Sequence, residues 1–262
     1  MTVAESVVRL SWSQVSAYTQ CPAKWWFSRR RPAEFVPSAL KFGTAVHKAV
    51  AAFHTARMEG CSLTAEDLLG VYEAAWSEPE TADIRYGKGE DERTLRDMAG
   101  RMLAAFLEGV EPAEVLAVEQ GFAVEIAEGV LVSGFIDLVE VKEGRFWVVD
   151  AKTSRGEPST AFDGEQLILY RLALQRIGLV PEGADVGLRY DVLRKLKTKG
   201  EFVSVVVETT DKQLDDLRLK VGQVARAVEA GIVYRNRSWA CAGCPWANAC
   251  AEAVLGEEAP TP

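Results

Sequence analysis

One stretch decides the fold: Val130-Leu-Val-Ser-Gly-Phe-Ile-Asp137-Leu-Val-Glu-Val-Lys-Glu-Gly-Arg-Phe-Trp-Val-Val-Asp150-Ala-Lys152. Its Val, Ile and Phe content is typical of β-strands, and Glu143-Gly144 can form the hairpin turn between two of them. Counting outward from that turn places Asp137 directly opposite Asp150, and opposed residues share a face with Cβ atoms about 4.5–5.5 Å apart. Lys152 follows Asp150 by two positions and lies on the same face. The sequence therefore predicts two acids and an ammonium group converging on one point of a sheet.

This arrangement favours a metal site. Two carboxylates at that distance repel each other strongly unless a cation lies between them. Carboxylate oxygens are the ligands that Mg²⁺ or Mn²⁺ requires, and such an ion would polarise a phosphodiester oxygen and lower the pKa of a bound water. Lys152 would orient that water or neutralise charge in the transition state. The alternative is a strand with polar residues facing water, and Val139 and Val148 on the same face argue against it.

The segments around this stretch predict a mixed α/β fold. Ser11 and Gln14 form a capping-box pattern at a helix start, and Pro22 places Cys21 at a junction between two helices. The order of elements favours a mixed central β-sheet flanked by helices. The patterns predict helices near 42–53, 64–77, 93–110, 164–178 and 211–230, and strands near 115–126, 130–141, 145–151, 186–194 and 202–208.

Four of the five cysteines form a second pattern. One lies near the N-terminus and three form C-x2-C-x5-C near the C-terminus: Cys21, Cys241, Cys244 and Cys250. Thiolates are soft ligands, and short spacings let one loop wrap an ion, so this set indicates either zinc or an iron–sulfur cluster. The distant thiol would join the two ends of the fold. Cys61 is left over, and we expect a buried, inert thiol there.

Charge and hydropathy narrow the function classes. The 262-residue chain has a net charge of −8, which counts against a simple DNA-coating protein. A nuclease can instead hold phosphate through metal ions and local basic patches. The chain has no apolar run of about eighteen residues and its first residues lack a signal-peptide pattern. We therefore expect no membrane span and a cytoplasmic protein, where structural disulfides are rare.

Two local basic patches are candidates for DNA contact. One consists of Lys24 and residues 29–31, and solvated surface charge is an equal alternative for each patch. The second would follow a DNA backbone: Arg194, Lys195, Lys197 and Lys199.

Two further pairs extend the candidate site. His47 and His54 lie seven residues apart on one predicted helix, and either imidazole could be an extra metal ligand; the spacing does not choose between them. Gln166 and Tyr170 are four residues apart, so they share one side of a helix and could donate hydrogen bonds to phosphate.

Together these motifs resemble the RecB-like branch of the PD-(D/E)XK nuclease superfamily. The resemblance is to its iron–sulfur members: the CRISPR-associated RecB-type exonucleases, the AddB nuclease domain and related phage exonucleases. Besides the cysteines and the opening helix, the matching motifs are Gly43-Thr-Ala-Val-His47, Gly134-Phe-Ile-Asp137, Asp150-Ala-Lys152 and Gln166-Leu-Ile-Leu-Tyr170. Each motif is short, but five in the right order are specific. One departure is Asp150, where many relatives carry Glu, and the family tolerates either.

The resemblance implies the parts of a nuclease. His47 rather than His54, with Asp137, Asp150 and the backbone carbonyl of Ala151, would bind Mg²⁺ or Mn²⁺. Lys152 would assist the attacking water. A [4Fe–4S] cluster would be held by the four cysteines of the pattern: Cys21, Cys241, Cys244 and Cys250. The catalytic set would be Asp137, Asp150, Lys152, Gln166 and Tyr170, with the last two positioning the scissile phosphate or Lys152.

The resemblance also implies an architecture and an activity. A single nuclease domain, 1–262, would have an N-terminal helical part (11–110), a restriction-endonuclease-like core (114–210), a C-terminal helix with the cysteine cluster (211–255) and a disordered tail (256–262). The activity would be metal-dependent DNA exonuclease cleavage of single strands or DNA ends, in recombination, repair or CRISPR spacer capture. The expected partners are DNA and a helicase or a recombination or CRISPR adaptation protein. The chain has no G-x-x-x-x-G-K-[ST] motif, so any unwinding must come from a partner. The alternatives are a non-catalytic iron–sulfur DNA-end-binding or assembly subunit, and a zinc protein of unrelated function. Cleavage polarity and oligomeric state stay open.

Overall fold

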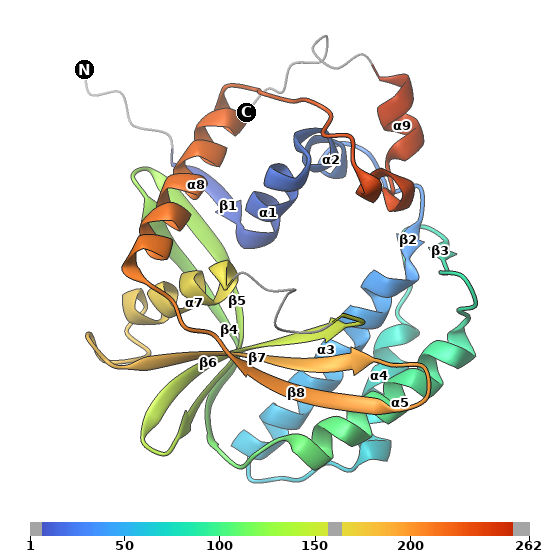
Figure 1. Cartoon of the computed structure of the whole chain (residues 1–262), viewed down its shortest axis with the longest axis vertical. Helices are drawn as coiled ribbons and strands as arrows, with labels where there is room; N and C mark the ends of the chain where they lie inside the picture. The colour runs from blue at the N-terminus through green and yellow to red at the C-terminus, as the bar shows by residue number, and fades with distance from the viewer. Residues whose placement is uncertain (1–6, 157–163, 254–262) are drawn as a thin grey trace.

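The computed structural model describes residues 7–156 and 164–253. Its centre is a six-stranded mixed sheet with helices on both faces (Figure 1), as the sequence predicted. The strands are β1 (Val8–Ser11), β4 (Glu114–Ala127), β5 (Val130–Lys142), β6 (Arg145–Ser154), β7 (Val186–Lys195) and β8 (Gly200–Val206). A separate parallel pair joins β2 (Val36–Pro37) to β3 (Ile84–Arg85).

The β5–β6 hairpin has the predicted register. Lys142 pairs with Arg145, and the pairs continue to Leu138 with Val149, one position short of Asp137 and Asp150. Glu143 and Gly144 have φ angles of 53° and 77°, so both central turn residues are left-handed, as a type I′ turn requires. This turn adds no extra residue, which is why counting outward from it gives the correct pairing.

Strand β5 changes partners along one of its edges. β4 runs antiparallel along one edge for nearly the whole length of β5. On the other edge, β1 pairs in parallel with residues 130–133, and β6 pairs antiparallel with residues 138–142. Residues 134–137 therefore lie where β1 has ended and β6 has not begun. The sheet is split at this point, and the split determines where the candidate site lies.

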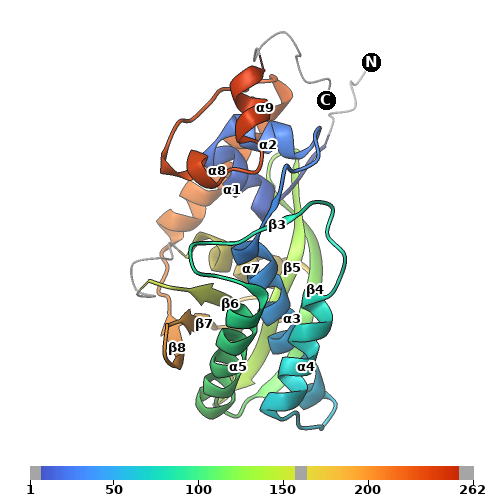
Figure 2. The ribbon, with the colours of Figure 1, turned by 90° about the vertical axis from the view of Figure 1, so that its right-hand side faces the viewer.

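Helices cover the two faces of the sheet as two separate layers (Figures 1 and 2). The first layer packs α1 (Trp12–Gln20), α2 (Pro22–Ser28), α7 (Glu165–Arg176) and α8 (Asp211–Glu229) over a face that includes Val139, Val148 and Leu188. The second packs α3 (Ser38–Met58), α4 (Ala65–Trp76) and α5 (Glu92–Gly109) against Leu193. The short 3₁₀ helix Trp239–Gly243 and α9 (Ala247–Glu252) complete the described chain.

Several local predictions can be compared with the structure. Ser11 accepts a hydrogen bond from the backbone N–H of Gln14 in a complete capping box, and Cys21 lies between α1 and α2, both as predicted. The buried thiol expected at Cys61 is wrong: Cys61 follows the turn at the end of α3 and is exposed. The predicted tail, 256–262, lies outside the described residues. Within the described chain, no helix is long and apolar enough to span a membrane.

Candidate active site

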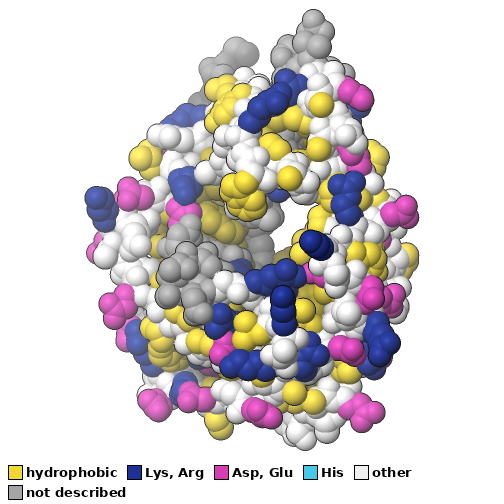
Figure 3. Space-filling model, turned by 45° about the vertical axis from the view of Figure 1, so that its right-hand side comes forward, with side chains coloured by type: hydrophobic (Ala, Val, Ile, Leu, Met, Phe, Trp, Pro, Cys, Tyr) yellow, Lys and Arg dark blue, Asp and Glu magenta, His cyan; other side chains and the backbone are white. Residues whose placement is uncertain are grey.

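A cleft of about 1060 Å³ opens at the split in the sheet. Helix α1 forms one wall, and the sheet residues around the split form the other. Figure 3 shows the molecule hollowed between these walls, with Lys and Arg side chains gathered beside the hollow. The predicted residues His47, Asp137, Asp150, Ala151 and Lys152 all line this cleft. Gln166 and Tyr170 line it as well.

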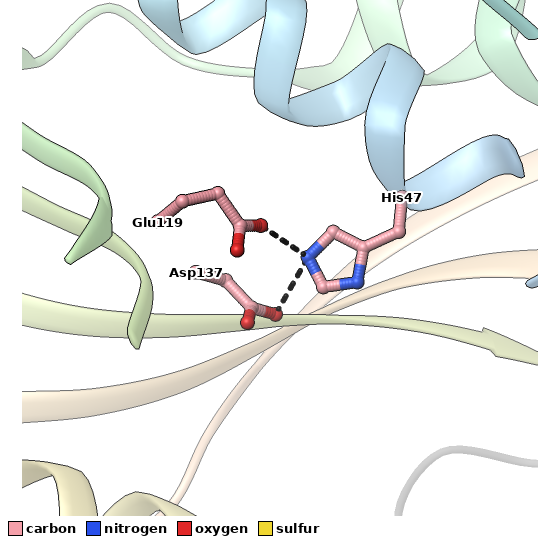
Figure 4. Close-up of side chains that lie close together, drawn as sticks. All are labelled: His47, Glu119 and Asp137. Carbon is pink, nitrogen blue, oxygen red and sulfur yellow. Dashed lines mark ion pairs between the residues drawn. The ribbon is translucent and has the colours of Figure 1, made fainter. Parts of the chain in front are cut away.

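An imidazole and two carboxylates meet at the centre of the cleft (Figure 4). His47 Nε2, on α3, lies 3.1 Å from Glu119 Oε1 on β4 and 3.3 Å from Asp137 Oδ2 on β5. Neither contact has hydrogen-bond geometry, so this buried nitrogen has no hydrogen-bond partner. The three ligand atoms lie within 4.8 Å of one another. An imidazole nitrogen and two carboxylate oxygens at this spacing are suited to a divalent metal ion.

The strands are irregular where they supply these acids. Glu119 has a φ of 49°, a left-handed conformation that side chains other than Gly rarely adopt. On β5, Val132 and Ile136 face the first helical layer, and so does Val139, so the alternation of faces breaks at Asp137. Glu119 lies opposite Asp137, between the pairs Val118–Leu138 and Gln120–Ile136. The two irregularities coincide at the one point where both strands present a carboxylate to the cleft.

A chain of polar contacts holds the lysine beside the acids. Lys152 Nζ lies 2.5 Å from Asp150 Oδ2 and donates a hydrogen bond to Gln166 Oε1 at 2.9 Å. Gln166 Nε2 in turn donates to Tyr170 Oη at 2.6 Å. The Tyr170 ring packs edge-on against Phe122, with 5.8 Å between ring centroids. The ammonium group is thus fixed from two sides, and the second side is anchored in the core.

Burial and mutual repulsion disturb the titration of the acids. Burial raises the pKa of Asp137 to about 7, and the Asp150 charge adds to the rise. Burial also raises the pKa of Asp150, against the opposing effect of Lys152. For His47, burial lowers the pKa, but the Glu119 and Asp137 carboxylates outweigh it and the net shift is upward. Each shift reflects acids crowded together in a place where a cation would relieve the repulsion.

The donor atoms fit a divalent metal. Asp150 is 1% exposed, and neither of its carboxylate oxygens has a hydrogen-bond partner. Buried carboxylate oxygens are costly unless they are paired, and hydrogen-bond geometry is absent even in the Lys152 ion pair. Asp137 Oδ2 also accepts a hydrogen bond from the Ala151 backbone N–H at 2.9 Å, which fixes that carboxylate next to the Ala151 peptide. His47, Glu119 and Asp137 make up the compact group, while Asp150 is drawn toward Lys152.

The sequence prediction did not include Glu119. Counting outward from the turn at Glu128-Gly129 places Gln120, not Glu119, opposite Asp137. The structure has a register shift between Glu125 and Ala127 that moves the pairing by one residue. The acid in a strand-like segment was a visible signal, but a β-bulge cannot be read from this sequence pattern.

The second histidine has a different environment. His54 is 2% exposed and lies between the rings of Phe53 and Phe106, at centroid distances of 5.1 and 5.8 Å. Burial, together with the charges of Arg57 and Arg189, lowers its pKa to about 3. His54 is therefore a neutral core residue, whereas His47 meets the carboxylates.

The four cysteines of the pattern line one cavity of about 130 Å³ between α2 and the C-terminal segment. Cys61 does not line it. Hydrogen bonds attach the two segments independently of the thiols: Glu34 accepts from Asn248 at 2.7 Å, and Trp246 Nε1 donates to the Arg31 carbonyl at 3.1 Å. The structure thus brings together thiols that are more than 200 residues apart in sequence.

The predicted basic patch lies at the end of the β7–β8 hairpin. Arg194 pairs with Glu201 at 2.5 Å, and Lys195 is half-buried over the Phe42 ring. Burial lowers the pKa of Lys195 to about 8, and the charge of Arg155 adds to the effect. Lys197 and Lys199 are exposed. The patch is thus less uniform than the sequence suggests, and none of its four residues lines the cleft.

Comparisons with known proteins agree with this geometry. The family model of the PD-(D/E)XK nuclease superfamily matches residues 9–251. No curated protein shows significant sequence similarity to the chain. Among solved structures, a protein from Eubacterium rectale named "Putative exonuclease" has a TM-score of 0.54 at 16% identity, over 98% of this chain and 91% of that one, which indicates a shared fold. The protein SSO0001 covers 92% of this chain, and 94% of its own, at 13% identity, with a TM-score of 0.36 that carries no argument.

Proposed function

The chain belongs to the PD-(D/E)XK nuclease superfamily, and on that premise we propose that it is a metal-dependent DNA exonuclease. The superfamily consists of nucleases that hydrolyse phosphodiester bonds with divalent metal ions, and DNA is the substrate that the family implies. The observation that carries the proposal is the convergence of His47, Glu119 and Asp137 within 4.8 Å, beside the Asp150–Lys152 pair.

The site residues have two roles: some would bind the metal ion, and Lys152 would stabilise negative charge. His47, Asp137 and Asp150 would hold Mg²⁺ or Mn²⁺ with the Ala151 carbonyl, and Glu119 adds a carboxylate to this set. The bound ion would polarise the scissile phosphate and lower the pKa of a water. Asp150 and Gln166 hold the Lys152 ammonium from two sides.

Lys152 would donate a hydrogen bond to the attacking water or to the phosphate oxygen on which charge develops. Gln166 accepts from Lys152 with its carbonyl and donates to Tyr170 with its amide. This leaves Gln166 with one orientation, so we assign Gln166 and Tyr170 the positioning of Lys152. Because the charge-stabilising group is already in place, no reorganisation is needed when the phosphate arrives.

The test is cleavage of end-labelled DNA with and without metal. We expect activity with Mg²⁺ or Mn²⁺ and none in chelator. Lys152→Met and Asp150→Asn should each reduce kcat by about 100-fold or more while the protein stays folded. Lys48→Met, on the same helix as His47 but paired with Glu78 at the surface, should cleave normally. Full cleavage by the Asp150→Asn protein would contradict this assignment, and release of single nucleotides or short fragments would distinguish end degradation from internal cutting.

We further propose that Cys21, Cys241, Cys244 and Cys250 hold a [4Fe–4S] cluster. All four thiols line one cavity, although they come from opposite ends of the sequence. Their pattern, one N-terminal cysteine and a C-terminal C-x2-C-x5-C, is that of the iron–sulfur nucleases which the chain resembles. The cysteines Cys250 and Cys21 lie close enough to add to the burial that raises the pKa of Cys244.

The DNA path is a separate proposal. Single strands or DNA ends would enter the cleft, with the exposed Lys197 and Lys199 contacting the backbone outside it. Charge-neutralising changes at these two lysines should flatten the dependence of log affinity on log salt, by about 0.7 for each phosphate of a single strand that is no longer neutralised. An unchanged slope would move the path toward Lys24, which lines the cleft. With this activity, the protein would act together with a helicase in the cytoplasm, in recombination, repair or CRISPR spacer capture.

A further inference from the structure

One exposed aromatic ring lies inside the cleft. Phe135 is 62% exposed and lines the cleft together with Asp137, two residues further along β5. Successive positions on a strand advance by about 3.3 Å, so the two backbone positions are about 7 Å apart. Among the large hydrophobic residues that the described chain exposes, only Phe135 and Leu40 line this cleft. Among the aromatic residues that line the cleft, Phe135 is thus the exposed one, and it lies on the same strand as Asp137.

The ring is held in place by a glycine. Phe135 pairs with Gly121 on β4, and a Cβ at Gly121 would lie 3.5 Å from the edge of the ring. The ring therefore packs against bare backbone instead of against another side chain. Cross-strand packing on a glycine explains how the ring is oriented. Such packing can occur at any position of a sheet, so it does not explain why the ring lies in the cleft. It does not account for an apolar ring facing a cleft that contains three carboxylates.

The charges in the cleft disfavour a duplex. Among the described residues that line it, Lys24 and Lys152 are the cations, against Glu119, Asp137 and Asp150. A duplex brings two phosphate backbones and affinity that comes mostly from cationic contacts. A single strand can instead gain binding free energy from stacking its bases on aromatic rings.

The opposite wall, formed by α1, is uncharged and combines polar side chains with Trp12 and Ala17. The α1 side contributes Ser13, Ser16 and Gln20, which fall on one face of that helix at spacings of three and four residues. Hydroxyl and amide groups can contact a sugar–phosphate backbone without reading its sequence. The α1 wall thus offers polar groups beside the half-buried Trp12, and the sheet wall offers the exposed ring of Phe135 beside the metal ligands.

We propose that Phe135 is a stacking platform for the base of the nucleotide next to the scissile phosphate, and that it makes the cleft select unpaired DNA. The proposal rests on the nuclease function argued above. Within a duplex both faces of each internal base are covered by its neighbours, so an internal base reaches Phe135 only where the strand is unpaired. Stacking on the ring would fix the terminal nucleotide while the adjacent phosphate lies at His47 and Asp137.

The test is a double-mutant cycle in which the Phe135 ring and one DNA base are removed separately and together. Binding is measured with Mg²⁺ in the Lys152→Met background, which slows cleavage, using labelled single strands in which one nucleotide at a time is made abasic. Phe135→Ala should weaken binding of the intact strand by about 5- to 150-fold. At one position, loss of the base should weaken binding similarly when Phe135 is present and have no effect in Phe135→Ala. Phe135→Trp should bind like Phe135, whereas Phe135→Leu should bind like Phe135→Ala.

The matched control is Tyr86→Ala, which removes another exposed aromatic ring that does not line the cleft and should leave binding unchanged. The inference is overturned if every abasic penalty is the same with and without the ring, or if Phe135→Leu binds like the parent. Cleavage by the protein with Lys152 intact is scored separately. Activity without a Phe135 effect rejects only the platform, and absence of any cleavage rejects the nuclease proposal itself.

Discussion

Replacing His54 should change how stability depends on pH. This imidazole is buried between two phenylalanine rings, and burial with two nearby arginine charges lowers its pKa to about 3. Asp191, which lines a small cavity together with His54, is already bound by Arg189 and Ser204, so it does not offset those charges. In the unfolded chain the pKa is 6.5. The folded state therefore excludes a proton that the unfolded state binds.

The pH dependence of the unfolding free energy follows from the difference in the pKa of His54 between the folded and unfolded states. Because the folded pKa is depressed, the contribution of His54 to the free energy of unfolding is fully present above pH 6.5 and is lost as the pH falls toward 3. Between pH 8 and pH 5 the loss is about 2 kcal/mol. The loss would be nearly the same for any pKa of His54 in the folded state below about 4, because such an imidazole is neutral at pH 5.

The assay is urea unfolding of metal-free protein at pH 8 and pH 5, followed by tryptophan fluorescence. The difference in unfolding free energy between the parent and His54→Leu should fall by about 2 kcal/mol from pH 8 to pH 5. His47, the only other histidine, is the matched control because its pKa is raised. Its contribution is present below pH 6.5 and lost as the pH rises, so the difference for His47→Leu should change in the opposite direction. A His54 difference that is constant with pH would refute the reasoning.

Three further changes test other parts of the structure. Cys21→Ser should abolish visible absorbance from an iron–sulfur cluster and lower stability, whereas Cys61→Ser should do neither; bleaching by the second change would reassign the ligands. Glu119→Gln should weaken Mg²⁺ binding, measured by calorimetry. Removal of an outer-shell partner weakens metal binding about 10- to 100-fold, and loss of a direct ligand should cost at least as much. Unchanged affinity would exclude Glu119 as a ligand. Gly134→Ala brings a Cβ to 3.1 Å from an aromatic ring and should cost about 1–3 kcal/mol in a thermal melt. Gly43→Ala meets its nearest atom at 3.6 Å and should instead stabilise its helix by up to about 1 kcal/mol, so equal effects would contradict the packing argument.

The sequence predicted the register of the hairpin that carries Asp137 and Asp150 because its turn is regular. The type I′ turn at Glu143-Gly144 adds no residue, so counting alone placed Asp137 opposite Asp150. The preceding hairpin contains a bulge, and the same counting missed Glu119. Whether a register can be predicted therefore depends on insertions that are set by tertiary packing and not by local sequence.

The two histidines show a second limit of sequence patterns. Seven residues on a helix return to nearly the same face, so periodicity treats His47 and His54 as equivalent. They are nevertheless about 10.5 Å apart along the helix axis. Helix α3 crosses the sheet, so one imidazole reaches the cleft and the other reaches the core between α3 and α5. A helical pattern predicts the direction of a side chain, but not its depth in the fold.

The short strand β1 links the fold to the site. Its four residues are too few for a strand pattern, and the sequence prediction included only the helix that follows. Its pairing with residues 130–133 ends where the pairing of β6 has yet to begin. If β1 continued along β5, a neighbouring strand would occupy the edge of residues 134–137. The cleft exists because β1 stops and becomes α1 at Ser11, and the capping box that starts the helix therefore also keeps the site open.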